Sequence, residues 1–332
     1  MKAIAKTTLS MIIILVIIIA AIGVYYVYTM QKPPTVQYPT KPITIYVPWS
    51  AGGGTDRTTR EIATILQQKW GVQINVLNKV GGGGAATFYA GATVTPDGYT
   101  WTAITIELSI YPHLGTSNVS YQDFKPIAML ICNPAVVVVK SDAPWNTIQD
   151  LMNYIKQNPG KLKASGTAMA GVWDIARIGL LKAFNLSSNA LPWVPSTGAA
   201  PALQELLSGG IQVAIVGSGE AKPFVDAGQV KILTVMADSR IQGLENVPTL
   251  KELGINWSIC GWAGLAVPKD TPDDVVSIIV NAVKEAYNSR DFQTFLKNNS
   301  FVGKLMLGQD FKNYLTQEYN TFRPLLKEAG YI

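Results

Sequence analysis

Two glycine-rich loops, each between an apolar run and an amphipathic run, constrain this chain more than any other feature. The first loop is Pro48–Asp56, after the apolar run Ile43–Val47, and the second is Gly81–Ala86, after Gln73–Leu77. A strand that ends in a glycine loop and continues as a helix directs free backbone N–H groups at one spot, at the positive end of the helix dipole. Two such loops side by side predict a binding site for an anion such as a carboxylate or phosphate.

The composition indicates a folded chain with a large core. Of its 332 residues 48% are hydrophobic and 15% are charged, which is enough for one large or two medium domains. The net charge of +5 is modest, and no Lys/Arg run occurs. We therefore expect no nucleic-acid partner.

The N-terminal region is expected to lie outside the fold. Leu9–Met30 carries no charge and is long enough to span a bilayer as a helix. Lys2 and Lys6 predict that residues 1–8 stay cytoplasmic and that everything after Met30 is extracytoplasmic. We expect residues 9–30 to be an uncleaved membrane anchor and the proline-rich residues 31–42 to be a stiff linker. A cleaved signal peptide is the alternative.

From Ile43 onward, short β-rich runs alternate with helical runs, which predicts an α/β fold with a parallel sheet covered on both faces. The predicted strands are Ile43–Val47, Gln73–Leu77, Thr100–Thr105, Ala135–Lys140, Val213–Val216, Lys231–Ala237 and Gly264–Val267. The predicted helices are Thr58–Lys69, Ala85–Ala92, Ile148–Gln157, Val172–Phe184, Pro201–Ser208, Pro223–Ala227, Pro272–Ser289 and Gln309–Ala329. Asp56 is a candidate cap for the first helix, and Asp273 and Asp274 follow Pro272 at another helix start.

Weaker glycine loops recur later, at Ser165-Gly166-Thr167 and at Ser196-Thr197-Gly198. Four strand-to-helix loops in two sets predict two α/β lobes that face each other across a cleft, with the ligand beyond the carboxyl ends of the strands. Trp49, Trp173 and Trp193 lie in or beside these loops. They predict a cleft wall that covers an apolar or planar part of the ligand.

Signals for catalysis or a cofactor are weak. Gly81-x-Gly83-x-x-Ala86 with Glu107 downstream has the spacing of a dinucleotide fingerprint, but it follows the second strand of a domain predicted to face outward. His113 is the only histidine, and the sequence contains neither a Gly-x-Ser-x-Gly elbow nor a metal-ligand spacing. We expect no catalytic residue, no metal and no cofactor. Cys132 and Cys260 can pair outside the cell, but the sequence does not decide this.

Several motifs together resemble the extracytoplasmic solute-binding subunits of tripartite tricarboxylate transporters, the TctC or Bug family. The motifs are Ala51-Gly52-Gly53-Gly54-Thr55-Asp56 with Arg60, Asn78-Lys79 with Gly81 and Gly83-Gly84, Pro96-Asp97-Gly98-Tyr99-Thr100, Val194-Pro195 with Gly198, and Val247-Pro248-Thr249 with Glu252. The resemblance runs from about Tyr38 to Gly330. It implies a two-lobed periplasmic-binding-protein (Venus flytrap) fold with mixed, mostly parallel sheets, in which residues 43–140 and 266–332 form lobe I and residues 141–265 form lobe II.

The resemblance also implies a function without catalysis. A small carboxylate is held in the cleft and delivered to polytopic membrane permease subunits. The implied ligand-binding residues are Trp49, Ala51, Gly52, Gly53, Asp56, Gly83, Gly84, Ser165, Gly166, Thr167, Trp173, Asp174, Ser196, Thr197 and Gly198. Asp56 is expected to shape its loop rather than to contact an acid directly. A ligand sensor for a membrane signalling protein is one alternative. An extracytoplasmic enzyme that uses Asp56, Asp174 and Glu220 is another.

The chain departs from the family pattern at four positions, where Trp49, Val80, Asp174 and Ser196 replace the usual Phe, Pro, His and Tyr. Asp174 is open to two interpretations. If it points into the cleft, its charge disfavours a second carboxylate on the ligand. Alternatively, it only caps the helix that starts there.

Overall fold

The computed structural model describes residues 13–26, 36–328 and 330–332, which fall into two compact units that meet at Tyr38 and Pro39. In the first unit, residues 13–26 form a helix. Among the described residues, no helix combines the length and apolar character needed to cross a membrane. The segment 1–8 predicted to be cytoplasmic, both ends of the predicted anchor 9–30 and residues 31–35 of the predicted linker lie outside the described residues.

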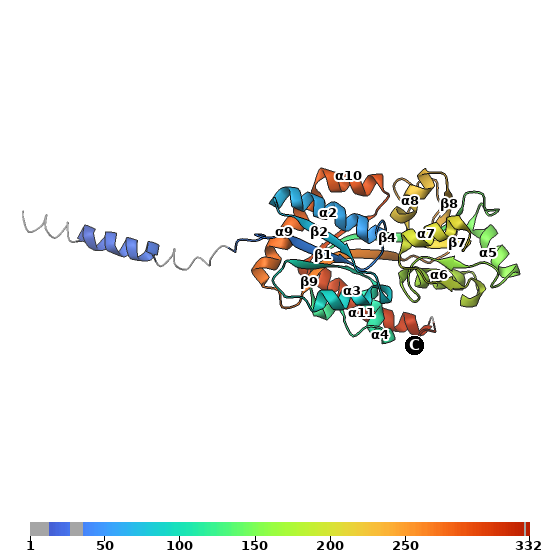
Figure 1. The fold of residues 1–332 in the computed structure, drawn as a ribbon, viewed down its shortest axis with the longest axis horizontal. Helices are drawn as coiled ribbons and strands as arrows, with labels where there is room; N and C mark the ends of the chain where they lie inside the picture. Colours follow the sequence, from blue (N-terminus) through green and yellow to red (C-terminus); the bar gives the residue numbers. More distant parts are fainter. Residues whose placement is uncertain (1–12, 27–35, 329) are drawn as a thin grey trace, which may run out of the picture. The chain divides into compact units, whose positions relative to one another are not determined.

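The second unit is built on a curved mixed sheet with the strand order β2-β1-β3-β9-β4-β7-β5-β6, to which β8 and β10 add by pairing with β4. The strands are β1 (Ile43–Val47), β2 (Ile74–Asn78), β3 (Thr100–Thr105), β4 (Phe124–Lys140), β5 (Ala164–Ser165), β6 (Trp193–Val194), β7 (Val213–Gly217), β8 (Val230–Val235), β9 (Cys260–Pro268) and β10 (Gly303–Leu307). Figure 1 shows this sheet running through two groups of helices.

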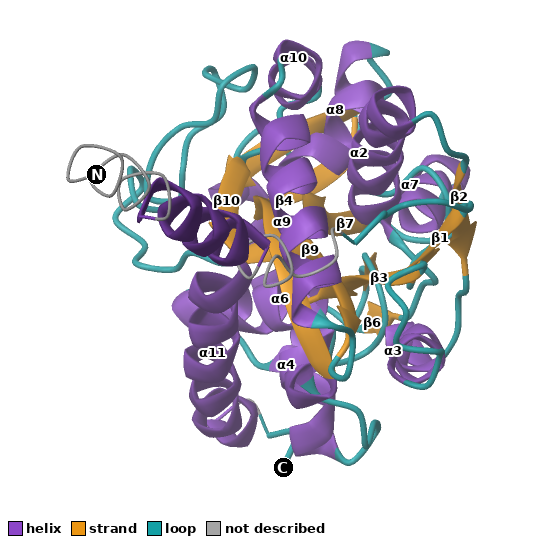
Figure 2. Ribbon diagram, turned by 90° about the vertical axis from the view of Figure 1, so that its left-hand side faces the viewer, coloured by secondary structure: helices purple, strands orange, loops and turns teal. Residues whose placement is uncertain are grey.

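The helices cover both faces of the sheet, as predicted. They are α2 (Gly54–Trp70), α3 (Ala85–Ala92), α4 (Glu107–Leu114), α5 (Ile148–Gln157), α6 (Val172–Ala183), α7 (Ala199–Ser208), α8 (Ser218–Asp226), α9 (Asp273–Asn288), α10 (Arg290–Asn298) and α11 (Gly308–Glu328), with short 3₁₀ turns at Gly82–Gly84, Tyr121–Asp123 and Ser188–Ala190. Helices α9 and α11 pack against β4 (Figure 2).

Strand β4 connects the two halves of the sheet. Its Phe124–Pro134 part pairs with β9, and its Ala135–Lys140 part pairs with β7 and β8. Every residue from Pro126 to Val139 is buried and all but Asn133 are apolar, so the strand shows no alternation, as expected for a strand covered on both faces. The strand begins at Phe124 instead of the predicted Ala135. Pro126 and Pro134 obscure the pattern, and a register shift follows Pro126.

The sheet is less parallel than predicted. Pairs β1–β2, β1–β3, β5–β6 and β5–β7 are parallel. The five other pairs all involve β4 or β9 and are antiparallel. Strands β4 and β9 lie at the centre of the sheet and are antiparallel to each other and to all the other strands they pair with.

Helix starts differ from the predictions where a glycine precedes them. Helix α2 begins at Gly54 instead of Thr58, and α8 begins at Ser218 instead of Pro223. Gly53 is the N-cap of α2 and makes no side-chain capping bond, so Asp56 is the third helical residue and not the cap. Pro272 is likewise the N-cap of α9, without a side-chain bond.

Several elements give no clear signal in the sequence. Helix α4 contains Pro112, and α10 follows α9 after the single residue Ser289, so neither is predicted. Strands β5 and β6 have two residues each, which is too short for a periodic pattern. Strand β10 is also missed; it pairs only with β4 and is partly buried at most.

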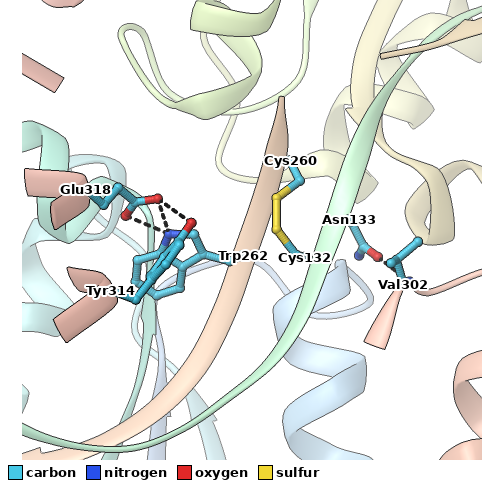
Figure 3. The surroundings of a disulfide bond; sticks show 7 residues. All are labelled: Cys132, Asn133, Cys260, Trp262, Val302, Tyr314 and Glu318. Atoms are coloured by element: carbon cyan, nitrogen blue, oxygen red, sulfur yellow. Dashed lines mark hydrogen bonds between the residues drawn. A yellow bond between two sulfur atoms is a disulfide. The ribbon is translucent and has the colours of Figure 1, made fainter. Parts of the chain in front are cut away.

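A disulfide joins Cys132 of β4 to Cys260 of β9, with 5.3 Å between the two Cα atoms (Figure 3). The two cysteines therefore pair in this structure, which the sequence leaves open. The bond lies next to the point where β4 changes partners, because Ala135 N–H donates to the Ile259 carbonyl immediately before β9.

Candidate functional site

A narrow cavity lies beside the centre of β4 and β9 and has about 30 Å³ accessible to the centre of a water molecule. It is lined by Trp49, Gly53, Gly54, Thr55, Thr105, Ile106, Glu107, Ile131, Asn133, Thr167, Val172, Trp173, Ala199, Glu220, Gly261, Trp262 and Ala263. These residues come from the first and third glycine loops, from the end of β3, from the starts of α2, α4, α6, α7 and α8, and from strands β4 and β9. The cavity therefore collects contributions from both halves of the sheet.

The first loop reaches the cavity through the start of α2. Gly53 and Gly54 line the cavity, and Gly52 adopts a φ of +84°, which favours glycine. Asp56 is buried and turns away from the cavity lining. Its carboxylate accepts hydrogen bonds from Gly52 N–H (2.9 Å), Arg60 Nε (2.9 Å) and Asn78 Nδ2 (2.9 Å), so it fixes the loop.

The third loop repeats this arrangement at the start of α6. Asp174, again the third helical residue, accepts hydrogen bonds from Ala170 N–H (2.9 Å), Arg177 Nη2 (2.6 Å) and the Tyr331 hydroxyl (2.6 Å). Its side chain is fully buried, and the residue is not part of the cavity lining. Asp174 therefore does not point its charge into the cavity, and it is not the cap of α6 either, because Gly171 is the N-cap; like Asp56, it holds its loop from the third helical position.

Two buried glutamates line the cavity, and each accepts a hydrogen bond from the start of a helix in the other half of the sheet. Glu220, the third residue of α8, accepts hydrogen bonds from Gly54 N–H at the start of α2 (3.0 Å) and from Gly217 N–H (2.7 Å). Glu107, the first residue of α4, accepts hydrogen bonds from Val172 N–H at the start of α6 (3.1 Å) and from Thr105 Oγ1 (2.7 Å). The starts of α2 and α6 therefore each already donate one backbone N–H to a carboxylate of the protein itself.

The surroundings of both glutamates shift the pKa of their carboxyl groups in the same direction, upward. Burial raises the pKa of Glu220, partly offset by its two backbone hydrogen bonds and by the charge of Arg57. Burial also raises the pKa of Glu107, partly offset by its bonds to Thr105 and Val172. Neither residue is among the ligand contacts expected from the sequence. In the sequence, Glu107 stands two residues after the end of β3, and Glu220 stands three residues after Gly217, the last residue of β7.

Three tryptophans line the cavity. Trp49 Nε1 donates to Thr105 Oγ1 (3.4 Å), and Trp262 Nε1 donates to both carboxylate oxygens of Glu318 (2.8 and 2.7 Å; Figure 3). The ring of Trp173 lies against Gly261, where a Cβ atom would come within 2.7 Å of it. Trp193, also predicted for the cleft wall, is not among the lining residues; the Arg177 guanidinium lies 5.7 Å from its ring centroid.

The second glycine loop contributes no residue to the described cavity lining. Gly83 has a φ of +65°, and a Cβ atom there would come within 2.2 Å of the Tyr111 hydroxyl oxygen and 2.9 Å of Ala168. Gly84 N–H donates to the Gly81 carbonyl (3.0 Å). The ligand-binding roles of Gly83 and Gly84 stay predictions.

The fourth loop contacts the first directly. Ser50 N–H donates to the Thr197 carbonyl (3.2 Å), and Ser50 Oγ donates to Thr197 Oγ1 (2.9 Å). A Cβ atom at Gly198 would lie 3.3 Å from Ser50 N. Ala51 and Gly52 lie on the exposed side of the first loop. Ser196 N–H donates to the Thr167 carbonyl (2.9 Å). Ser165 and Gly166 are buried beside Thr167 in the third loop. The first and fourth loops are therefore joined directly by hydrogen bonds.

The TctC family model, described as "Tripartite tricarboxylate transporter family receptor", matches residues 58–331. The chain belongs to this family. TctC receptors are extracytoplasmic solute-binding proteins rather than an enzyme family, and the two-lobed binding-protein fold expected from the sequence is confirmed. Among the described residues, no group of three His, Cys, Asp or Glu is placed to hold a metal ion.

Relatives of this TctC chain match it over most of its length. A UPF0065 protein of Bordetella pertussis is 28% identical over 298 residues, which cover 88% of this chain and 91% of that protein. The crystal structure of a TctC solute-binding protein from Polaromonas has 31% sequence identity and a TM-score of 0.64, and covers 88% of this chain and all of that one. Rpa4515 of R. palustris, solved with adipate, has 25% identity and a TM-score of 0.83, and covers 89% and 99% of the two chains.

Proposed function

We propose that this TctC chain captures a small organic acid in the cavity between its two lobes and delivers it to a membrane permease. The observation that carries the proposal is that α2 and α6, from opposite halves of the sheet, both start at this cavity. Gly54 and Val172 N–H donate to Glu220 and Glu107, but the next backbone N–H groups of both helices have no carbonyl partner inside the helix, and the helix dipoles add positive potential. The adipate in the R. palustris relative agrees with a carboxylate ligand.

Closure of the two lobes is the signal that the permease reads in this proposal. Bonds that cross the cavity link Ser50 to Thr197, Glu220 to Gly54 and Glu107 to Val172. A ligand that contacts both sides adds to these bonds and shifts the equilibrium toward the closed form. Lobe I over residues 43–140 and 266–332 and lobe II over residues 141–265 remain the predicted moving parts.

The position at the membrane is also part of the proposal. Leu9–Met30 follows Lys2 and Lys6 and leads into a proline-rich linker, which supports an anchor that keeps the binding domain near its permease on the outer side. Cell fractionation with and without an alkaline wash tests this directly, since an anchored chain stays in the membrane pellet.

Binding is tested by titrating the purified full-length chain with mono-, di- and tricarboxylates and following its melting temperature and its tryptophan fluorescence. We expect saturable stabilisation by at least one acid, growing with concentration as mass action requires. Thr167→Val removes a cavity hydroxyl and should lower the affinity about tenfold, the effect of losing one buried hydrogen bond of about 1.4 kcal/mol. Thr93→Val, on the exposed end of α3, serves as the matched control. The absence of saturable binding by any acid contradicts the proposal.

A further inference from the structure

We propose that Glu107 takes up a proton when a carboxylate ligand binds and donates it in a hydrogen bond to that carboxylate, so that acid and proton enter the cavity together. This inference rests on the proposed function, because it names how the same cavity holds an acid without a cationic side chain. The proton comes from the solvent and stays on Glu107, and the ligand remains a carboxylate.

The cavity lining contains two acids and no cation. Glu107 and Glu220 line it, and none of the described lining residues is Lys, Arg or His. A ligand carboxylate beside two ionised glutamates would bring a third negative charge into a cavity of only about 30 Å³, where like charges repel strongly. A protonated acid beside a carboxylate removes this repulsion, because the two groups then share one proton.

Of the two glutamates, Glu107 is the better place for the proton. Burial raises the pKa of Glu220, but two backbone hydrogen bonds and the charge of Arg57 act against the rise. Burial also raises the pKa of Glu107, and there only hydrogen bonds act against it. Glu107 lies near further acids as well, since burial and then the charge of Glu107 raise the pKa of Tyr111 and of Glu318.

The elements around the cavity carry other titratable and charged groups, which are engaged elsewhere. They are Asp56 and Arg60 of α2, Asp174 and Arg177 of α6, His113 of α4, and Tyr314 and Glu318 of α11. The two Asp–Arg pairs are 2.9 and 2.6 Å apart. His113 Nε2 is bonded to the Tyr319 carbonyl (2.7 Å), and the Tyr314 hydroxyl donates to Glu318 (2.9 Å). None of these groups supplies a cation to the described lining.

The hydrogen bonds of Glu107 leave room for such a proton. Val172 N–H donates to Oε1 (3.1 Å), so this oxygen acts as an acceptor. Thr105 Oγ1 accepts from Trp49 Nε1 (3.4 Å) and donates to Oε2 of Glu107 (2.7 Å). Because Thr105 is the donor in that bond, a proton on Oε2 is available to a ligand oxygen in the cavity.

Two further donors lie on the same side of the cavity as Glu107. The Thr167 hydroxyl is buried, with the residue 5% exposed, and has no hydrogen-bond partner in the described structure. A Cβ atom at Gly171 would lie 3.1 Å from Thr167 Oγ1 and 3.4 Å from Glu107 Oε1, which places these side chains beside each other. Trp173 N–H, next to Val172 in the first turn of α6, has no intrahelical acceptor. A protonated Glu107 therefore completes a group of neutral donors for one carboxylate.

The bond between Glu107 and Val172 couples the proton to closure. The two residues lie in different lobes of the predicted division, so opening breaks the bond and exposes Glu107 to water, where a glutamate has a pKa of about 4.3. The pKa of Glu107 is thus higher in the closed complex than in the open free protein. Affinity is greatest below the pKa of the open form and falls as the pH rises toward that of the complex, by up to about tenfold per pH unit.

The test is isothermal titration calorimetry on the full-length chain between pH 6.5 and 8.5, with acetate, succinate and adipate as probes. Two buffers with different ionisation enthalpies count the protons taken up. For the probe that binds most tightly, we expect uptake of about one proton and an affinity that falls at least tenfold across this range. Binding without proton uptake and without pH dependence overturns this inference and leaves the proposed function standing. Saturable binding by none of the three probes overturns both.

Glu107→Gln replaces the titrating donor by a permanent one. Its amide oxygen accepts from Val172 N–H, and its amide nitrogen donates one hydrogen to Thr105 Oγ1 and one to the ligand. We expect this variant to bind the same probe without proton uptake and with an affinity that no longer changes with pH. Proton uptake that persists in Glu107→Gln overturns the inference.

Two matched variants identify the titrating group. Glu318→Gln removes an acid whose pKa burial raises to about 7 but which does not line the cavity, so proton uptake should persist. Glu61→Gln, at a partly buried acid of α2 that faces Asp291, should change neither affinity nor uptake. Loss of the proton uptake in Glu318→Gln would assign the proton to α11 and overturn the inference.

Where Glu107→Gln does not fold, infrared difference spectroscopy on wild type decides the matter. Binding should produce the C=O stretch of a protonated carboxyl group, and a probe labelled with ¹³C should leave this band in place, because it belongs to the protein. The absence of the band overturns the inference.

Discussion

Glu318 shows how one side chain of α11 supports the cavity wall. It accepts hydrogen bonds from Trp262 Nε1 and from the Tyr314 hydroxyl (2.9 Å), and Trp262 in turn lines the cavity (Figure 3). Burial raises the pKa of Glu318 to about 7, although these hydrogen bonds act in the opposite direction. The carboxyl group therefore changes its charge close to neutral pH.

This pKa gives a pH dependence of stability with a defined sign. The folded protein holds the Glu318 proton to higher pH than the unfolded chain, so the stabilisation is fully present below the unfolded pKa of about 4.3 and is lost as the pH rises through about 7. We expect urea unfolding of wild type to show falling stability from pH 5 to 8. Glu318→Gln should flatten that slope. An unchanged slope would contradict the assignment.

Gly83 allows a clean comparison of backbone strain with side-chain collision. Gly83→Ala should destabilise the fold by about 2–4 kcal/mol, since its φ of +65° disfavours alanine and the new Cβ collides with the Tyr111 hydroxyl. Gly71→Ala has nearly the same φ, +67°, and open space around it, so it should cost only the backbone part of about 1–2 kcal/mol. Equal losses in the two variants, measured by urea unfolding, would exclude the collision.

At the scale of elements, the sequence predicts helices that have a periodic apolar pattern, and it misses features that depend on contacts with residues far away in the chain. Helices α3 and α5 have the bounds that the sequence predicts. Helix α5 follows the capping residue Thr147, and both helices are short segments with clear ends. Helices α2 and α6 reach the cavity through glycine N-caps, which give no side-chain signal, so the start of α2 is misplaced. The roles of Glu107 and Glu220 depend on Val172 and Gly54, which lie far away in the chain. No local pattern contains that information.

The disulfide between β4 and β9 gives a prediction at this scale. It closes a loop with a sequence separation of 128 residues, so its removal in Cys132→Ala/Cys260→Ala should lower the free energy of unfolding by about 2–5 kcal/mol. Reduction of wild type should have a similar effect, whereas adding reductant to the double variant should have none. Equal urea midpoints for wild type and variant would contradict a stabilising role.

For the whole molecule, closure depends on contacts between loops that are far apart in sequence. Ser50 and Thr197 lie in different lobes of the predicted division, and their side-chain oxygens are 2.9 Å apart. The four glycine loops and the resemblance to a known family both predict the two lobes and the cleft. The loops that meet across it can be identified only in the folded chain, because this contact joins residues 147 positions apart.

A crosslink at this contact should hold the lobes together. In Ser50→Cys/Thr197→Cys, we expect oxidation to form a bond more readily with ligand present than without it, and we expect release of bound ligand to slow at least tenfold. Moving one cysteine to an exposed site, as in Lys161→Cys/Thr197→Cys, provides the control. Ligand release at an unchanged rate from the crosslinked protein would show that the ligand does not leave through this opening.

The position of the disulfide also determines how the molecule responds to a protease. Cys132 and Cys260 lie at the two ends of the segment that contains α5, α6, α7 and α8, so the bond encloses nearly all of the second half of the sheet. A single cut anywhere between them leaves both pieces covalently joined. Such a nicked molecule migrates as an intact chain on a denaturing gel until it is reduced, so a receptor damaged outside the cell keeps all its parts.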